Sequence, residues 1–395
     1  MKRWRASPIP QMPILFLIIV IDLVGFGIIL PLLPFYAVRF QASPLTVTTV
    51  MACYSFAQFI ASPLLGRLSD RFGRRPILIA SLVCSIMGYL WLGFADALWM
   101  LFAARLLAGA GGGNIGAAQA YVSDITTHEH RAKGMGMIGA AFGIGFTIGP
   151  AIGGILAGSD GTAAALARPA FAAALFSALA LVLTLFRLEE SLSKRQGEPP
   201  PRRGRLEFAR TALMRPSLRR LILVGFLTTL AFAGMETTFA LWANSHLDWG
   251  PREVGRLFFF IGAVLVVVQG GLIGRLARRF GEAALIVAGA VAIAAGLVAL
   301  PAFPTLTGVL IASGVLALGM GLLNPSMTSL ASREAEEDER GGILGVSQSA
   351  ASLARILGPL IAGAAYQGWG RDVPLLLGAG VMVVVVGLAL LVMRR

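Results

Sequence analysis

The stretch Gly66-Arg67-Leu68-Ser69-Asp70-Arg71-Phe72-Gly73 decides the fold, because the chain repeats it about 209 positions later as Gly274-Arg275-Leu276-Ala277-Arg278-Arg279-Phe280-Gly281. A second pair keeps nearly the same spacing: Gly149-Pro150-Ala151-Ile152-Gly153-Gly154 returns as Gly358-Pro359-Leu360-Ile361-Ala362-Gly363. Segments that match at a fixed spacing indicate two related halves. In a membrane protein, two such halves are typical of a transporter built from parallel repeats, related by an axis along the membrane normal.

The composition places these halves in a membrane. Hydrophobic residues make up 56% of the chain and charged residues 13%, which is far outside the range of soluble proteins. The charges separate apolar runs of roughly 18–25 residues, the length at which a helix spans a bilayer. Helices are expected throughout, because backbone groups in lipid must be satisfied within their own segment. We predict twelve spans, near residues 14–36, 47–66, 76–94, 98–122, 134–157, 166–186, 219–242, 253–273, 282–300, 306–329, 342–366 and 373–393.

The basic residues predict the orientation of these spans. The net charge is +13, but the arginines and lysines concentrate in alternate loops. This is the positive-inside pattern, and it places both termini in the cytoplasm. Topology therefore explains the charge without a nucleic-acid partner. The opposite loops hold only Arg39, Arg168, Arg252, Arg256 and Arg371.

One long polar stretch, residues 188–218, divides the chain and carries Pro199-Pro200-Pro201. Such a composition is typical of a linker. Its later part, Leu206 to Arg220, is either a basic amphipathic helix on anionic headgroups or a solvated spacer. The predicted domains are an N-terminal six-helix bundle over 1–187, a cytoplasmic linker over 188–218 and a C-terminal six-helix bundle over 219–395.

Glycines mark three of the predicted spans. In the fifth, Gly145, Gly149, Gly153 and Gly154 surround Pro150, and the eleventh repeats this pattern. Small residues four apart let helix backbones approach closely, and a proline bends a helix. We interpret these spans as a bending, tightly sealed pair at the interface between the halves, with plain tight packing as the alternative. The fourth span is also rich in glycine, which indicates close approach to a neighbour or a substrate.

Four ionisable residues fall inside predicted spans: Asp22, Arg105, Glu236 and Arg355. A charge at the bilayer centre costs about 2.5–3.5 kcal/mol, so each is a candidate for a functional site that faces a cavity. Asp22 is the strongest, because proton coupling needs a group that takes up and releases a proton. Arg105 would stabilise its ionised form or an anionic group of a substrate. A purely structural ion pair is the alternative.

The sequence is compatible with two positions for Glu236 and two for Arg355. Glu236 lines the cavity, as a proton site or a partner for cationic substrates, or it lies near the outer interface, satisfied by Thr237 or water. Arg355 lines the cavity or caps a contact on the cytoplasmic side.

Neutral polar side chains and aromatic rings are the further candidates for the substrate cavity. Some are expected to face it, and others to bridge helices or face lipid. The polar candidates are Gln58, Asn114, Gln119, Gln269, Asn324 and Gln348, and the aromatic ones are Phe26, Phe56, Phe232, Phe239 and Trp242.

The stretch from Gly66 to Arg75 resembles the loop between helices 2 and 3 that marks the major facilitator superfamily, specifically its twelve-helix drug/proton antiporters. The resemblance implies an all-α membrane fold of two six-helix bundles related by pseudo-two-fold symmetry. It also implies that this loop forms a charged latch, which holds the halves together in the outward-facing state. The latch residues by matching position are Gly66, Asp70, Arg71, Gly73 and Arg74.

Other stretches carry the same resemblance. Arg105 with Gly109 resembles the helix 4 motif tied to proton transfer, and the glycines from Gly145 to Gly154 resemble the helix 5 motif of antiporters. The N-terminal half is most similar to tetracycline/proton antiporters. Those proteins carry an acid in helix 3 where this chain aligns Gly88, and another in helix 9 where it has only Glu282, at the cytoplasmic edge.

The resemblance implies a proton-coupled antiporter that exports small amphiphilic compounds by alternating access. We expect a monomeric, multi-pass protein of the bacterial inner membrane, whose partners are a small molecule, protons and the lipid bilayer, without cofactor or metal. An exporter of a sugar, metabolite or lipid with the same fold is the alternative. An enzyme is not expected, because the sequence shows no catalytic cluster and His128, His130 and His246 are predicted in loops.

Overall fold

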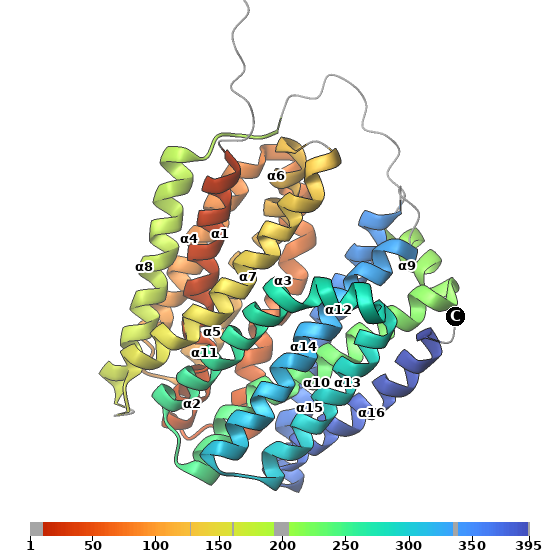
Figure 1. The fold of residues 1–395 in the computed structure, drawn as a ribbon. Coiled ribbons are helices and arrows are strands. Elements are labelled where there is room, and N and C mark those ends of the chain that lie inside the picture. The colour runs from red at the N-terminus through yellow and green to blue at the C-terminus, as the bar shows by residue number, and fades with distance from the viewer. Residues whose placement is uncertain (1–10, 127, 160–161, 193–204, 335–338, 394–395) are drawn as a thin grey trace, which may run out of the picture. The chain divides into compact units, whose positions relative to one another are not determined.

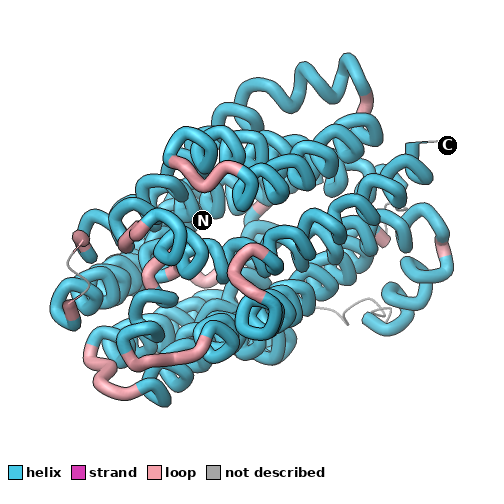
Figure 2. The backbone as a smooth tube through the Cα atoms, turned by 90° about the horizontal axis from the view of Figure 1, so that it is seen from below, coloured by secondary structure: helices cyan, strands magenta, loops and turns pink. Residues whose placement is uncertain are grey.

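The structure is a computed structural model that describes residues 11–126, 128–159, 162–192, 205–334 and 339–393. These residues form helices joined by short connections, and none of them lies in a strand (Figures 1 and 2). Ten helical segments in this part of the chain are long and apolar enough to span a membrane. The predicted all-α membrane fold is therefore confirmed.

The other two predicted spans are also helical. Each is absent from these ten for a different reason. The span predicted at 98–122 is divided into α5 (Leu98–Gly111), a 3-10 turn (Gly112–Asn114) and α6 (Ile115–Ile125). The span predicted at 342–366 lies in α15 (Arg340–Trp369), which carries serines, glutamines and an arginine among its apolar residues.

The described chain forms two compact units. Met1–Leu32 and Phe56–Glu198 make up the first, while Leu33–Ser55 and Pro199–Arg395 make up the second. The sequence assigned Leu33–Ser55 to the N-terminal bundle, and in the structure it groups with the C-terminal part of the chain. The predicted division into a bundle, a linker and a second bundle stays a prediction.

In the first unit, α1 (Gln11–Ile29) packs against α7 (His128–Ala157) and α8 (Ala163–Arg187). Helix α4 (Arg74–Gly93) packs against α5 and α8, and α3 (Pro44–Phe72) contributes its second half. Figure 1 shows α1, α4, α7 and α8 as neighbours. Their buried faces meet in an apolar core that includes Leu15, Ile18, Leu82, Tyr121 and Ala180.

In the second unit, α13 packs between α14 and α16, and α10 packs against α15 and α16 (Figure 1). Trp242, Phe239 and Phe258 belong to its large apolar core. The elements are α2 (Leu33–Arg39), α9 (Arg205–Met214), α10 (Pro216–Leu247), α11 (Pro251–Val267), a π-helical turn (Val268–Leu272), α12 (Ile273–Phe280), α13 (Glu282–Ala302), α14 (Leu306–Glu334), α15 and α16 (Val373–Met393).

Helix α9 belongs to the linker segment for which the sequence left two interpretations open. The segment from Leu206 to Arg220 was expected to be an amphipathic helix or a spacer, and it is helical in α9 and again from Pro216, where α10 begins. Ala212 is buried with Leu218 and Ile343, and Arg215 pairs with Glu339 at 2.8 Å. The segment is thus attached to α10 and α15, while its contact with headgroups stays a prediction.

Glycines bring α1 and α7 into close contact. A Cβ on Gly145 would lie 2.7 Å from the Cβ of Leu23, and one on Gly149 would lie 2.7 Å from the Cα of Gly27. Gly153 meets the carbonyl group of Ile28 in the same way. Pro150 and Gly154 are also buried in this helix. The close packing predicted for these glycines is confirmed, and in the first unit the partner is α1.

The second unit uses the same device between α10 and α15. A Cβ on Gly358 would lie 2.6 Å from the carbonyl oxygen of Leu230, and one on Gly234 would lie 3.1 Å from the Cβ of Ala362. The internal repeat in the sequence therefore corresponds to a repeated helix contact.

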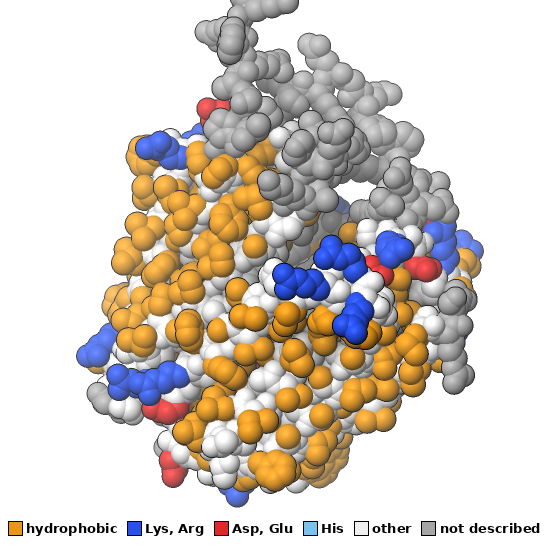
Figure 3. Space-filling model, viewed as in Figure 1, with side chains coloured by type: hydrophobic (Ala, Val, Ile, Leu, Met, Phe, Trp, Pro, Cys, Tyr) orange, Lys and Arg blue, Asp and Glu red, His pale blue; other side chains and the backbone are white. Residues whose placement is uncertain are grey.

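The surface suits lipid. Hydrophobic side chains cover most of the visible face in Figure 3, and lysines and arginines gather in a few separate groups. Large exposed apolar residues include Phe186, Leu175, Ile311 and Val383. The histidines differ from the sequence prediction: His128 and His130 lie in α7 and His246 in α10, because these helices extend beyond the predicted spans. The described residues contain no group of three or more potential metal ligands.

Candidate functional site

The break between α5 and α6 places polar backbone inside the first unit. All three residues of the 3-10 turn, Gly112–Asn114, are buried. A Cβ on Gly111 would lie 2.6 Å from the carbonyl oxygen of Ser81 in α4, and one on Gly113 would lie 3.0 Å from the backbone nitrogen of Ser62 in α3. Two neighbouring helices therefore approach the turn as only glycine allows. The close approach predicted from the glycine density of this span is confirmed.

Gln58 contacts the same turn. Its Nε2 atom donates a hydrogen bond to the carbonyl oxygen of Gly112 at 2.8 Å. A 3-10 turn changes the hydrogen-bond spacing of the helix, so carbonyl groups at the junction need other partners. Gln58, a predicted cavity residue, thus stabilises the broken helix.

Asp22 lies where α1, α8 and the 3-10 turn meet. The hydroxyl of Ser177 in α8 donates to the Asp22 Oδ1 atom at 3.2 Å, and the Asn114 side chain is a second hydrogen-bonding partner. Ser177 is fully buried and Asn114 is 8% exposed. Gly25, almost one turn after Asp22, permits this contact, because a Cβ there would lie 3.1 Å from the carbonyl oxygen of Ala173.

The two partners suit a carboxyl group that changes its protonation state. A serine hydroxyl donates and accepts, and an asparagine amide offers both a donor and an acceptor. Ser177 and Asn114 can therefore bind the ionised form of Asp22 by donating, and the protonated form by accepting. Both partners are neutral, so neither fixes the charge of the carboxyl group.

Arg105 is held on the adjacent part of α1. Its side chain is 3% exposed, and its guanidinium carbon lies 6.0 Å from the centre of the Phe26 ring, within the range of a cation–π contact. Phe26 also meets Phe146 of α7 edge-on at 5.7 Å. Asp22 and Phe26 are four residues apart and share one face of α1. The structure thus brings the predicted proton-coupling residues Asp22 and Arg105 to the same part of the first unit.

Glu236 and Arg355 come together in the second unit. Their charges interact across α10 and α15, and the Tyr54 hydroxyl also acts on Arg355. The guanidinium group donates to the Ser352 hydroxyl at 3.3 Å. Nothing in the sequence pattern predicted that these two charges interact. They lie on the two helices that pack closely at Gly234 and Gly358.

The remaining cavity candidates occupy varied positions. Phe239 is 2% exposed and packs against Trp242 at 5.8 Å and Phe258 at 6.3 Å, inside the apolar core. Asn324 is partly buried, whereas Gln119, Gln269 and Gln348 are exposed. A role for these side chains in substrate binding stays a prediction.

Arg74 is the centre of a charged cluster at the connection between α3 and α4. Its Nη1 atom donates to Asp70 Oδ1 at 2.6 Å and to Ser69 Oγ at 2.9 Å, and its Nε atom donates to Asp124 Oδ2 at 3.0 Å. Of the predicted latch residues, Asp70 and Arg74 are thus in contact. Arg71 lies over its neighbour Phe72 instead, 5.2 Å from the ring centre.

Gly73 and Glu190 complete this cluster. Gly73 has a φ of 109°, which favours glycine, and a Cβ there would overlap the Glu190 carboxylate. Glu190 accepts hydrogen bonds from the backbone N–H groups of Arg74 at 2.8 Å and Arg75 at 3.1 Å. Gly66, the other glycine of the motif, accepts a bond from Ser69 through its carbonyl group.

Three residues of these sites were missed by the sequence analysis: Ser177, Asp124 and Glu190. Ser177 is a lone serine in an apolar helix, and nothing in its pattern distinguishes it. Asp124 carried a usable signal, because it is an acid at the end of a predicted span, about 209 positions before Arg333.

The comparisons with known proteins cover nearly the whole chain. The family model described as Major Facilitator Superfamily matches residues 15–359 and 268–395. The tetracycline resistance protein, class C, of Escherichia coli is 33% identical over 88% of this chain and 87% of its own length. Multidrug resistance protein 2 of Bacillus subtilis (strain 168) is 29% identical over 94% of this chain and 92% of its own length.

Solved structures agree with the fold. The human organic anion transporter MFSD10 (TETRAN) superposes with a TM-score of 0.73 at 24% identity, over 98% of this chain and 100% of its own. A POT family transporter in complex with a thioalcohol-conjugated peptide reaches a TM-score of 0.79 at 15% identity, over 98% of this chain and 96% of its own. Identities this low bear on the fold alone.

Proposed function

The chain belongs to the major facilitator superfamily and is a membrane transporter, not an enzyme; from this premise we propose that it is a proton-coupled antiporter that exports small amphiphilic compounds. The curated relatives named above are tetracycline and multidrug resistance proteins, which supports drug-like molecules as substrates. We place the protein in a bacterial inner membrane as a monomer, with both termini in the cytoplasm.

One observation carries the proton coupling. The Asp22 carboxyl group lies within α1 and is bound by Ser177 and Asn114, two neutral side chains from different elements. Both can bind the protonated and the ionised carboxyl group. Asp22 can therefore keep hydrogen-bonding partners in both of its protonation states, as a proton carrier requires.

The proposed cycle follows from alternating access. A proton from outside neutralises Asp22, the halves rock inward, and the proton leaves. Substrate then binds from the inside, and the loaded protein rocks outward. Arg105 stabilises the ionised form of Asp22 during the step in which substrate binds.

The position of Gly88 bears on the substrate. The resemblance to tetracycline antiporters implies an acid in those proteins where this chain has Gly88, but a Cβ on Gly88 would lie 2.8 Å from both the backbone nitrogen and the Cβ of Ala108. A carboxylate side chain does not fit between α4 and α5 without a shift of one helix. We therefore propose a substrate range broader than tetracycline, bound without an acid at this position.

The test uses inside-out vesicles with an imposed proton gradient and a fluorescent pH probe. Wild type, Asp22→Asn and Asp96→Asn are compared with lipophilic cations, tetracycline with magnesium, fluoroquinolones, chloramphenicol and sugars. Asp96 is an exposed aspartate in the loop after α4, so it serves as the matched control. Substrate-triggered proton release in wild type and Asp96→Asn, but not in Asp22→Asn, is expected.

Two results would contradict the proposal. Undiminished proton release in Asp22→Asn would remove Asp22 from the coupling. A response to sugars alone, or to none of these compounds in folded protein, would favour the alternative exporter of a sugar, metabolite or lipid.

A further inference from the structure

The charged cluster around Arg74 has a counterpart in the second unit with the signs of its charges exchanged. Gly73 corresponds to Gly281 in the internal repeat, so Arg74, the first residue of α4, corresponds to Glu282, the first residue of α13. Asp124, near the end of α6, corresponds to Arg333, near the end of α14. A cation and an anion have exchanged places in the two halves.

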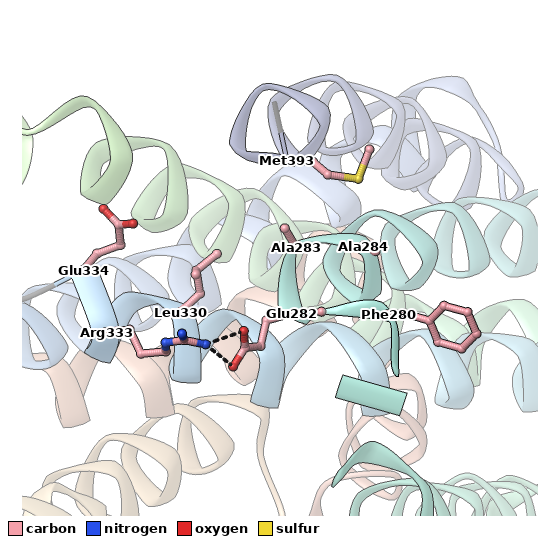
Figure 4. A pocket seen from close by; sticks show the side chains of 9 residues that line it. Phe280, Glu282, Ala283, Ala284, Leu330, Arg333, Glu334 and Met393 are labelled. Carbon is pink, nitrogen blue, oxygen red and sulfur yellow. Dashed lines mark hydrogen bonds and ion pairs between the residues drawn. The ribbon is translucent and has the colours of Figure 1, made fainter. Parts of the chain in front are cut away.

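The counterpart residues form a pair as well. Arg333 Nη1 donates to Glu282 Oε2 at 2.9 Å and to Oε1 at 3.2 Å, and the Ser329 hydroxyl donates to Oε1 at 3.0 Å. Figure 4 shows the two side chains pointing toward each other, from the start of α13 and from α14, in the lining of a pocket to which Leu330 and Met393 also contribute. The Glu282 side chain is 20% exposed and that of Arg333 is 69% exposed.

The helix dipoles explain why the two pairs differ in their surroundings. An anion is favoured at a helix N-terminus and a cation at a C-terminus. Glu282 and Arg333 satisfy both preferences, whereas Arg74 and Asp124 oppose both. The first unit compensates with Glu190, whose carboxylate accepts from the N–H groups of Arg74 and Arg75. The two halves thus form the same contact, but the positively and negatively charged residues occupy exchanged positions.

We propose that Glu282 and Arg333 form a second latch, the charge-exchanged counterpart of Arg74 and Asp124, which ties the ends of α13 and α14 together while the second unit moves. They are positioning residues, because they hold the start of α13 to the end of α14. Both halves make this contact with opposite polarity, so the tie between the helix ends matters more than the sign of each charge. The role in transport rests on the proposed alternating-access function.

The test exchanges the charges. Glu282→Arg, Arg333→Glu and the double variant are compared with Glu334→Arg and Arg279→Glu, which change the net charge equally at exposed positions next to the pair. The first readout is amide hydrogen exchange of the first two turns of α13 and the last two of α14, in detergent. The second is the maximal rate and the KM of transport in vesicles. Glu282→Gln and Arg333→Gln are measured in addition, because they introduce no repulsion.

Each single reversal is expected to speed exchange at both helix ends by about fivefold, since it replaces an attraction with a repulsion. It should lower the maximal rate and leave KM unchanged. The double exchange should restore both readouts to within about twofold of wild type, incompletely because its charges now oppose the dipoles. The two control variants should behave as wild type.

The proposal is overturned if the single variants exchange and transport as wild type, or if the double variant is as impaired as the worse single one. Hydrogen exchange needs no substrate, so the latch is tested even if no compound is transported. The converse result is a protein that carries out proton-coupled efflux while Glu282→Arg and Arg333→Glu have additive effects on hydrogen exchange and transport rate. That result would leave the proposed function intact and reject the latch.

Discussion

Glu190 caps the helix that Arg74 begins. Its two carboxylate oxygens accept from the first two N–H groups of α4, while the Arg74 side chain binds Asp70 and Asp124. The N-terminus of α4 would otherwise carry a cation against the helix dipole and unsatisfied N–H groups. A residue just after α8 thus stabilises the connection between α3 and α4.

Removal of this cap should destabilise the first unit. Glu190→Ala is expected to lower the free energy of unfolding by about 1–2 kcal/mol, because two backbone donors lose their acceptor. Thermal unfolding in detergent measures the loss. Glu189→Ala is the matched control, because Glu189 accepts from the Tyr121 hydroxyl through its backbone carbonyl group, which alanine keeps. Equal losses in the two variants would mean that the cap contributes nothing of its own.

The contact between α1 and α7 should not tolerate a methyl group. Gly149→Ala places a Cβ 2.7 Å from the Cα of Gly27, and such overpacking costs about 1–3 kcal/mol. We expect a lower unfolding temperature and slower efflux. Gly143→Ala on the same helix is the control, because its Cβ would meet nothing within 4 Å. If both variants unfold at the wild-type temperature, the close approach of α1 and α7 is not needed for stability.

The helices and several individual site residues could be predicted from the sequence, whereas most side-chain contacts between distant residues could not. Apolar length predicted the spans, and the rarity of charges in lipid singled out Asp22. Glycine density in the fourth span predicted the close approaches at Gly111 and Gly113. Ser177 could not be predicted as the partner of Asp22, because it lies 155 positions away on an apolar helix. Phe239 shows the same limit, since a phenylalanine in a membrane helix suits a core and a cavity equally.

Loss of the Ser177 hydroxyl should impair coupling more than folding. Ser177→Ala removes one hydrogen bond to Asp22, worth about 1 kcal/mol, and leaves Asn114 as the remaining partner. We expect substrate-triggered proton release to slow about fivefold, since 1.4 kcal/mol corresponds to a factor of ten. Ser81→Ala is the control: in the described chain the buried Ser81 hydroxyl has no hydrogen-bond partner, so this change should be neutral. Equal rates in both variants would separate Ser177 from the mechanism.

The interaction of Glu236 and Arg355 predicts an asymmetric result for single and double substitutions. Removal of one charge leaves the other without its counter-charge between α10 and α15, and an uncompensated charge inside a helix bundle is destabilising. Glu236→Gln and Arg355→Gln should therefore each unfold at a lower temperature than the double variant Glu236→Gln/Arg355→Gln. Arg256→Gln, at an exposed position of α11, controls for loss of a positive charge. Strictly additive destabilisation in the double variant would show that the two charges do not depend on each other, and each would then have to be satisfied by other groups of the second unit.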